Sequence, residues 1–345
     1  MKAITAETQL EKVRGFERGF RATHVVNMGM ALGLLSTLNE SLEGLSPKDL
    51  ALRLMLHEPY VRVWCQTAYH FEILDCDPRG KFAIQPFLAE SLGVPGFVPA
   101  LPPAPLFSGP ASSPAGPDPA LIYFARTGRP IPQAQGPGAS RATAEATQGF
   151  PLLFLSLILP RFEPVMKKLE QGARLLDVGC GQGRLLLELA KSFPRSRFAG
   201  LDPDVHALGQ AEAAAADLGL EDRLEWSALA AEDLDRPEEF DLVSLAATLH
   251  EILPEVRGRA VDRIYKALKQ GGRLLVLDYP YPGRIEDFRN PSYEFGIIEQ
   301  YFEIGQGVLH LTHDEQDELL SRAGFKDISR LGLGEGKLDF LTAVK

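Results

Sequence analysis

The second half of the chain alternates short apolar runs with longer stretches whose apolar residues recur at helical spacing. Such runs predict buried parallel strands, and the stretches between them predict crossover helices. The predicted strands are 174–178, 197–202, 223–227, 240–246, 273–279, 327–331 and 337–344, and the predicted helices are 183–192, 204–218, 255–269 and 312–323. The pattern therefore predicts an α/β fold, a doubly wound Rossmann-like sheet of seven strands closed by a terminal hairpin.

Residues 1–92 follow a different pattern and predict a separate, mainly helical domain. Ser46-Pro47 begins one helix, a second follows His57-Glu58-Pro59, and a turn at 75–80 precedes a short strand at 81–84. This order of helix, helix and hairpin predicts a winged helix that serves dimerisation and covers a substrate site; DNA binding is the alternative. The apolar run 24–38 predicts a core helix or a dimer surface.

Between these regions, residues 93–149 form a connecting segment rich in proline and glycine. Proline at this density removes hydrogen-bond donors and breaks helices, so an irregular linker is expected, interrupted by the apolar run 121–125. The third region, 150–345, begins with a mainly helical stretch, 150–169, that is expected to break near Pro160.

Composition excludes several classes of function. The 345 residues carry a net charge of −10, which argues against nucleic-acid binding because that needs a basic face. Three scattered cysteines, at 65, 76 and 180, suit neither a disulfide framework nor a zinc site. No apolar run approaches the ~18 residues of a membrane span, and the first residues lack signal-peptide character. A cytoplasmic protein without a membrane partner is expected.

The first strand of the α/β region leads into a turn with alternating glycines, Asp177-Val-Gly179-Cys-Gly181-Gln-Gly183. Glycine lets the backbone approach a ligand closely, and a strand, glycine-rich turn and helix offer main-chain N–H groups to nucleotides. The next strand ends in Asp202, 23 residues after Gly179. An acid about 20 residues beyond such a turn suits the two hydroxyls of a ribose.

These residues resemble motif I of the class I S-adenosylmethionine-dependent methyltransferases, and the resemblance extends over residues 172–345. It implies S-adenosylmethionine as the cofactor and S-adenosylhomocysteine as its product. It places Gly179, Gly181 and Gly183 at the methionine end and Asp202 at the ribose, with Asp177 and Ala246 as further cofactor-binding residues.

The same family usually has an acid after the third strand. Glu232 is the candidate here and Asp233 the alternative, although the usual Gly-Asp pair is replaced by Leu229-Ala230. A merely solvated acidic turn is the remaining interpretation.

After the fourth strand, Leu249-His250-Glu251-Ile252 resembles the Leu-His-Asp-Trp signature of winged-helix small-molecule O-methyltransferases. The resemblance implies that His250 removes the proton of a substrate hydroxyl and that Asp278, at the end of the next strand, orients it. Glu251 and Ile252 depart from the signature, and the region around His310 replaces a second acid. A role for His250 in positioning or structure stays open. No cluster of carboxylates suggests a metal.

The expected function is methyl transfer to a hydroxyl of an apolar small molecule, with an aromatic one favoured, by a homodimer. The substrate is expected near His250, the loop 279–282, the helix 150–159 and the N-terminal domain. C-methylation, with Tyr279 or Tyr281 as a possible base, is one alternative, and a cofactor-sensing regulator without catalysis is another. Nucleic-acid N-methylation is disfavoured because Ala246-Ala247-Thr248-Leu249 stands where an Asp/Asn-Pro-Pro turn would be required.

Overall fold

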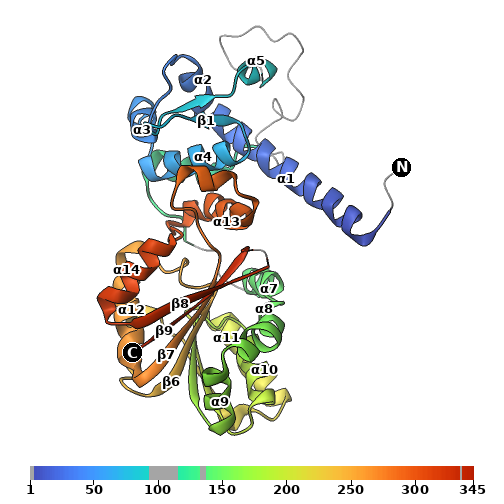
Figure 1. Ribbon diagram of the computed structural model, residues 1–345, viewed down its shortest axis with the longest axis vertical. Helices are drawn as coiled ribbons and strands as arrows, with labels where there is room; N and C mark the ends of the chain where they lie inside the picture. The colour runs from blue at the N-terminus through green and yellow to red at the C-terminus, as the bar shows by residue number, and fades with distance from the viewer. Residues whose placement is uncertain (1–3, 93–115, 133–136, 335) are drawn as a thin grey trace. The chain divides into compact units, whose positions relative to one another are not determined.

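A computed structural model describes residues 4–92, 116–132, 137–334 and 336–345 (Figure 1). The contacts within the chain divide it into two units. The N-terminal unit contains residues 1–131 and 282–307, and the sheet unit contains residues 132–281 and 308–345. Segment 282–307 thus groups with the N-terminal residues, whereas the sequence-based division had placed it within 150–345. Much of the predicted connecting segment, 93–115 and 133–136, lies outside the described residues.

The N-terminal unit is mainly helical, with one two-stranded sheet among its described residues. Its elements are α1 (Ala6–Ala31), α2 (Leu34–Asn39), α3 (Pro47–Leu54), α4 (Glu58–His70), β1 (Leu74–Cys76), β2 (Phe82–Ile84), α5 (Leu88–Leu92), α6 (Pro119–Thr127), the 3-10 turns η6 (Ile285–Arg289) and η7 (Pro291–Tyr293), α13 (Glu294–Glu303) and η8 (Ile304–Gln306).

Helix starts in this unit follow the local sequence. The Ser46 hydroxyl accepts a hydrogen bond from the Asp49 N–H at 3.1 Å and caps α3, as predicted. Helix α4 is the centre of the unit, since Trp64 is fully buried and its indole N–H donates to the Val25 carbonyl at 3.0 Å. The order α3, α4, β1, β2 matches the predicted helix, helix and hairpin. Their interpretation as a winged helix stays a prediction.

The later segment of the N-terminal unit is bound to its first helices. The hydroxyl of Tyr301, in α13, lies 3.3 Å from Nδ1 of His24, in α1. The main-chain carbonyl of Phe288 lies 2.7 Å from Nδ1 of His70, in α4. These long-range contacts explain why 282–307 groups with the N-terminal residues, which no local pattern could indicate.

The sheet unit contains a seven-stranded sheet in the order β5-β4-β3-β6-β7-β9-β8. The pairs among β5, β4, β3, β6 and β7 are parallel, and β9 pairs antiparallel with both β7 and β8. The predicted doubly wound sheet with an inserted terminal hairpin is therefore confirmed. The strands are β3 (Arg174–Val178), β4 (Arg197–Leu201), β5 (Leu224–Ser227), β6 (Phe240–Ala246), β7 (Leu268–Asp278), β8 (Lys326–Leu333) and β9 (Leu338–Val344).

Helices cover both faces of the sheet (Figure 1). They are α7 (Pro137–Ala146), α8 (Phe150–Leu153), α9 (Glu163–Gln171), α10 (Arg184–Ser192), α11 (Val205–Asp217), α12 (Pro254–Ala267) and α14 (His313–Ala323), with the 3-10 turns η4 (Glu221–Arg223) and η5 (Ala231–Asp233). Neighbouring residues of one strand point to opposite faces. Accordingly, Leu175 belongs to a buried cluster that includes residues of α9, α10 and α11, and Leu176 belongs to another that includes residues of α12 and α14.

Two predicted elements differ in detail. Helix α12 ends at Ala267 and β7 begins at Leu268, whereas the sequence had predicted a helix to 269 and a strand from 273. The reason is that Leu268 pairs with Phe240 across the sheet, a partner that helical spacing does not reveal. The stretch after Phe150 changes from α8 to a π-helical turn η2 (Phe154–Ile158) and a 3-10 turn η3 (Leu159–Arg161) before α9, so the predicted break near Pro160 is present.

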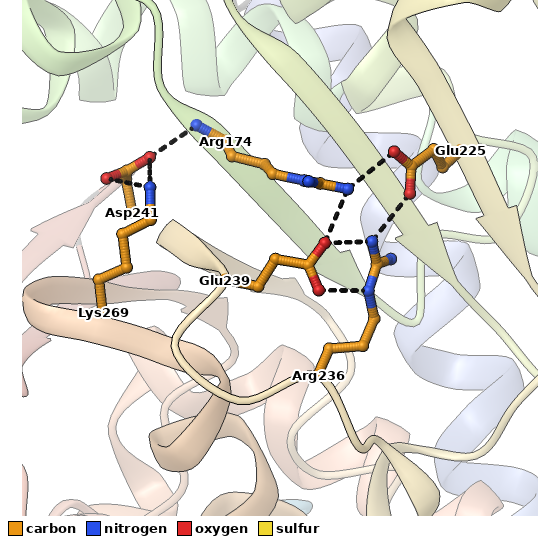
Figure 2. Close-up of polar contacts among 6 residues, drawn as sticks. All are labelled: Arg174, Glu225, Arg236, Glu239, Asp241 and Lys269. Carbon is orange, nitrogen blue, oxygen red and sulfur yellow. Dashed lines mark hydrogen bonds and ion pairs between the residues drawn. The ribbon is translucent and has the colours of Figure 1, made fainter.

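A network of ion pairs joins the amino ends of several strands (Figure 2). The Arg174 guanidinium, at the start of β3, lies 2.8 Å from a Glu225 carboxylate oxygen and 2.7 Å from one of Glu239. Arg236 contacts both of these carboxylates, which lie on β5 and before β6. Beside them, Lys269 lies 2.9 Å from Asp241. The network lies at the edge of the sheet opposite the carboxyl ends of the parallel strands.

Among the described residues, no single helix is long and apolar enough to cross a membrane. One bent pair, Thr143–Arg161 with Glu163–Gln171, reaches that length and composition only when the two parts are taken together across a 107° bend.

Candidate active site

A cavity of about 200 Å³ opens at the carboxyl ends of β3, β4 and β6. Ligands bind at this edge of open α/β sheets, where the strand order reverses. Of the predicted cofactor-binding residues, Asp177, Gly179, Gly181, Asp202 and Ala246 line the cavity. Gly183, Glu232 and Asp233 are not among its lining residues.

The turn after β3 needs glycine for two reasons. Gly179 and Gly183 have φ angles of +72° and +67°, a region that side chains disfavour. In addition, a Cβ on Gly179 would lie 2.4 Å from Thr248 Cγ2, and one on Gly183 would lie 2.4 Å from Trp226 Cη2. Gly183 therefore allows the turn to pack closely against Trp226, and it does not line the cavity itself.

The main-chain N–H groups of this turn are used within the protein, in contrast to the expectation that they bind the ligand. The Gly179 N–H donates to the Leu201 carbonyl at 2.7 Å, and the Gly181 N–H donates to Asp202 Oδ2 at 2.8 Å. Asp202 Oδ1 accepts a second hydrogen bond from the Asp204 N–H at 2.8 Å. These two bonds fix the carboxylate, whose remaining lone pairs can still accept hydrogen bonds from two hydroxyl groups.

Acidic residues outnumber the one basic residue, Arg184, along the cavity lining. Burial raises the pKa of Asp202, although the N–H groups of Asp204 and Gly181 oppose this effect. Burial, together with the charge of Asp202, raises the pKa of Asp177 to about 7 even though the Ser244 hydroxyl donates to its Oδ1 at 2.7 Å. Asp204 also lines the cavity. Three carboxyl groups so close together suit a ligand that carries positive charge.

Helix α7 lies on the cavity and was missed by the sequence analysis. The Ser140 hydroxyl donates to an Asp204 carboxylate oxygen, and Gln182 Nε2 donates to the Ser140 carbonyl at 3.1 Å. Arg184 Nη1 donates to the Ala144 carbonyl at 2.8 Å. Ser140 and Thr143 line the cavity. The surrounding proline-rich composition concealed this helix, and Ser, Thr and Ala at helical spacing were the only signal for it.

The predicted acids after the third strand lie elsewhere. Glu232 belongs to the 3-10 turn η5, and its carboxylate lies 4.0 Å from the Arg259 guanidinium; Asp233, next to it, is exposed. Their assignment as cofactor-binding residues stays a prediction for which the cavity gives no support.

The segment after β6 leads from the cavity to a buried histidine. Ala246 and Ala247 line the cavity, and Ala247 has a φ angle of +50°, a strained conformation for alanine that turns the chain. His250 follows and is 5% exposed. Its Nδ1 lies 2.5 Å from Oδ1 of Asp278, which ends β7 and is 4% exposed. The structure therefore brings the two predicted catalytic residues together.

The charge state of Asp278 follows from this contact. Burial by itself would raise the pKa of its carboxyl, but the interactions with His250, supported by His310 and the Tyr279 N–H, together outweigh burial, so the pKa lies below the ordinary value. The N–H of Tyr279 also donates to Oδ1, at 2.9 Å. An ionised Asp278 accepts the Nδ1 proton of His250, which leaves Nε2 as the basic nitrogen of the ring. Glu251 Oε1 lies 3.8 Å from this Nε2.

Aromatic rings surround His250. The His310 ring lies 4.3 Å from the His250 ring, with 33° between their planes, and the Tyr279 ring lies at 6.0 Å. Tyr281 lies 5.8 Å from His310. Burial is the main cause and the neighbouring His250 the second cause that lower the pKa of His310 to about 3, so this imidazole is neutral at neutral pH. The predicted loop 279–282 thus reaches the same neighbourhood through these two tyrosines.

Comparison with known proteins indicates the enzyme class of the domain that carries this site. Residues 176–274 match a methyltransferase domain family. The chain carries a class I S-adenosylmethionine-dependent methyltransferase domain. The methyltransferase is similar in fold to the O-methyltransferase family 2 protein of Planctomyces limnophilus solved with apigenin, with a TM-score of 0.70 and 22% identity over 96% of this chain and 94% of that one.

Two relatives match the methyltransferase over half of its length. An uncharacterized methyltransferase of Synechocystis is 28% identical over 173 residues, which cover 50% of this chain and 76% of the relative. The ubiquinone/menaquinone biosynthesis C-methyltransferase UbiE of Rickettsia bellii is 26% identical over 193 residues, with the same two coverages. The relatives thus support methyl transfer. They do not identify the acceptor atom of the substrate, which must be inferred from the site.

The cavity of the methyltransferase fits S-adenosylmethionine. Asp202 is held with lone pairs available for ribose hydroxyls, and the acidic lining suits a molecule with a sulfonium and an ammonium group. Gly179 keeps open the space that a side chain would fill against Thr248.

Proposed function

We propose that this enzyme transfers a methyl group to a hydroxyl of an apolar, aromatic small molecule. The observation that carries the proposal is the 2.5 Å contact between His250 Nδ1 and Asp278 Oδ1, buried at the end of the segment that lines the cofactor cavity. A hydroxyl is a weak nucleophile, so its methylation benefits from a base, whereas many other methyl acceptors need none.

Each residue has a distinct part in this mechanism. Asp202 and the turn at Gly179–Gly181 hold the cofactor, which supplies a methyl group on a positively charged sulfur. Asp278 keeps the Nδ1 proton of His250 in place, so Nε2 accepts the proton of the substrate hydroxyl as its oxygen bonds to the methyl carbon. Burial of both residues excludes water, which strengthens the interaction between them.

The preference for an apolar substrate rests on the rings near the base. Tyr279 lies 6.0 Å from the His250 ring and Phe150 lies 6.4 Å from Tyr279, so aromatic surface continues from the base toward the cavity, which Phe150 lines. An aromatic ring of a substrate packs favourably against such surface. Apigenin, with which the Planctomyces protein was solved, is also aromatic and hydroxylated.

The test uses the full-length protein, S-adenosylmethionine and a panel of phenols and hydroxyquinones. We expect methyl ethers as products, and a fall in kcat of about 10²-fold or more in His250→Ala with unchanged affinity for S-adenosylhomocysteine. Unchanged turnover in His250→Ala would remove the base role. Cofactor binding itself is tested by Asp202→Ala, for which calorimetry should show a loss of affinity.

C-methylation is the second candidate, and the match to the UbiE C-methyltransferases favours it. The same experiment separates the two, because mass spectrometry with fragmentation distinguishes a methyl on carbon from one on oxygen. A chain that binds the cofactor but methylates no acceptor would favour the regulator instead. A cytoplasmic location stays a prediction.

Homodimerisation also belongs to this proposal. Along α1, Leu10, Val13 and Phe16 recur at helical spacing and are exposed, Phe16 by 67%. The N-terminal half of α1 extends away from the other helices of its unit (Figure 1). A large exposed apolar stripe is typical of an interaction surface. Sedimentation should show a dimer, and Phe16→Glu should shift it toward the monomer.

A further inference from the structure

A buried arginine lies directly behind the two histidines of the candidate active site. Arg257 belongs to α12 and is only 4% exposed. Its guanidinium donates three hydrogen bonds, each to a main-chain carbonyl: Nε to Ile252 at 2.9 Å, and Nη2 to His250 at 2.9 Å and to Leu309 at 2.7 Å.

These three carbonyls belong to two segments that are far apart in the sequence. His250 and Ile252 lie in the turn after β6, and Leu309 immediately precedes His310. The guanidinium of Arg257 therefore fixes the position of one segment relative to the other. The imidazoles that those segments carry stand 4.3 Å apart, and one of them must also meet Asp278 at 2.5 Å.

We infer that Arg257 is the positioning residue of the transfer site, because it fixes through the main chain where the imidazoles of His250 and His310 stand. This inference rests on the proposed role of His250 as the base. A guanidinium suits the task better than an ammonium, since its rigid fork donates in several fixed directions at once. Burying a charge is costly, and here three carbonyl dipoles compensate it.

Burial lowers the pKa of Arg257 to about 10, partly offset by the charge of Asp278. The side chain is therefore still charged at neutral pH, and its hydrogen bonds are charge-assisted. Small displacements at a reacting centre reduce rates strongly, about 10²-fold for 1 Å, so loss of this support should affect turnover before it affects cofactor binding.

Arg223 offers a matched control. It too donates hydrogen bonds to three main-chain carbonyls, those of Ala190 at 2.7 Å, Phe193 at 3.3 Å and Ser196 at 3.4 Å. It ends η4, just before β5, and these carbonyls lie at the end of α10 and before β4, on the edge of the sheet opposite the cavity. Replacement by lysine removes the branched guanidinium, with its several N–H donors, in both cases.

The experiment compares Arg257→Lys with Arg223→Lys in the full-length protein. We expect Arg257→Lys to lower kcat by about 10- to 100-fold, with the KM for the acceptor and the Kd for S-adenosylhomocysteine changed by less than about threefold. Arg223→Lys should leave kcat within about threefold of the parent even if both variants lose similar amounts of thermal stability.

A spectroscopic readout makes the test independent of catalysis. The Nδ1 proton of His250, held by Asp278, should give a distinct proton resonance, which Arg257→Lys should shift or broaden and Arg223→Lys should leave in place. If Arg257→Lys does not fold, Arg257→Gln, which keeps two N–H donors, is measured in the same way.

Parent-like kcat and an unchanged His250 resonance in the Arg257 variant would overturn the inference, as would equal losses of kcat in both variants. If the parent methylates no hydroxyl acceptor, the proposed function fails, and the resonance alone still decides whether Arg257 positions His250.

Discussion

His250 Nδ1 and Asp278 Oδ1 lie 2.5 Å apart, although 28 residues separate them in the sequence. Each residue follows or ends a parallel strand, and β6 and β7 are neighbours with Ala246 opposite Leu277. The register of these two strands therefore decides whether the contact can form. A shift of one residue would turn the carboxylate of Asp278 to the other face of the sheet.

We expect Asp278→Asn to lower kcat by about 10²- to 10⁴-fold. The amide of asparagine can donate to Nδ1, which would move the ring proton to Nε2, and Nε2 could then no longer accept a proton from the substrate. Steady-state kinetics would measure the effect. The affinity for S-adenosylhomocysteine should remain within about threefold of the parent, because neither residue lines the cavity.

A second aspartate–histidine pair supplies the control for this variant. Asp339 lies opposite Asp278 on β9 and its carboxylate contacts Nε2 of His313. Asp339→Asn should leave kcat nearly unchanged, since His313 is not among the groups around His250. Equal losses in both variants would mean that Asp278 acts on the sheet and not on the base.

Asp177 should make the sheet unit less stable at neutral pH than at mildly acidic pH. Its pKa in the folded protein is raised to about 7, so the folded state holds this proton more tightly than the unfolded state does. The stabilisation is fully present below the ordinary pKa of about 4 and is lost as the pH rises through 7. Asp177→Asn should therefore flatten the dependence of stability on pH between 5 and 8.

The size of this effect is at most roughly 4 kcal/mol, from a shift of about three pKa units. Urea unfolding followed by the fluorescence of Trp226, with Trp64 replaced by phenylalanine in parent and variant, would report on the sheet unit. Parallel stability curves for parent and variant between pH 5 and 8 would contradict the assignment.

Local signals in the sequence predicted the elements whose causes are local. The capping box at Thr312 begins α14, and Gly324 ends it with a φ angle of +104°, both as the sequence indicates. The alternation of strands and helices was sufficient to predict the sheet, because a parallel strand needs a crossover to reach its neighbour. The pairing of His250 with Asp278 was instead implied by the resemblance to the winged-helix O-methyltransferases, and the contact at 2.5 Å agrees with it.

The remaining features depend on tertiary contacts that no spacing encodes. Arg257 looked like an ordinary helix residue, since its partners include Leu309, 52 residues away. Glu232 was expected to bind the cofactor because the resembled family usually has an acid after the third strand. Its carboxylate lies 4.0 Å from the Arg259 guanidinium, and its role stays a prediction. The helix α7 was missed because proline and glycine dominate the sequence before it, and its contacts to Gln182 and Arg184 are long-range.

The ion network at the amino ends of the strands should contribute to stability and not to cofactor binding (Figure 2). Arg236 contacts Glu225 and Glu239 and stacks over Phe240 at 5.0 Å. Arg236→Ala should lower the free energy of unfolding by about 1 kcal/mol, because a partly buried network of charges stabilises a protein more than an isolated surface pair does. The loss should be smaller at high salt, which screens the charges. The exposed pair of Arg263 and Asp235, at 3.3 Å, provides the comparison, and Arg263→Ala should have almost no effect on urea unfolding.

Calorimetry with S-adenosylhomocysteine completes this test. Its affinity should be the same for the parent and Arg236→Ala, because the network and the cavity lie at opposite edges of the sheet. A variant with weakened cofactor binding and intact stability would show that the amino ends of the strands influence the cavity.

Gly183 should tolerate no side chain, although it does not line the cavity. Alanine at this position would adopt a φ angle of +67° and bring its Cβ within 2.4 Å of the Trp226 ring. The backbone strain alone costs roughly 1–2 kcal/mol, and the clash with the partly buried ring of Trp226 adds to it. We expect Gly183→Ala to destabilise the sheet unit by about 2 kcal/mol or more and to weaken S-adenosylhomocysteine binding by at least about tenfold, since the turn that carries Gly181 must move.

Gly209 provides the matched control. It is a solvent-exposed residue in the middle of α11, with open space around its Cα and no positive φ angle. Gly209→Ala should stabilise the protein by about 0.5–1 kcal/mol, as alanine favours helix more than glycine does, and should leave cofactor affinity unchanged. Equal affinities for S-adenosylhomocysteine in the two variants would show that the packing of Gly183 on Trp226 does not shape the cofactor cavity.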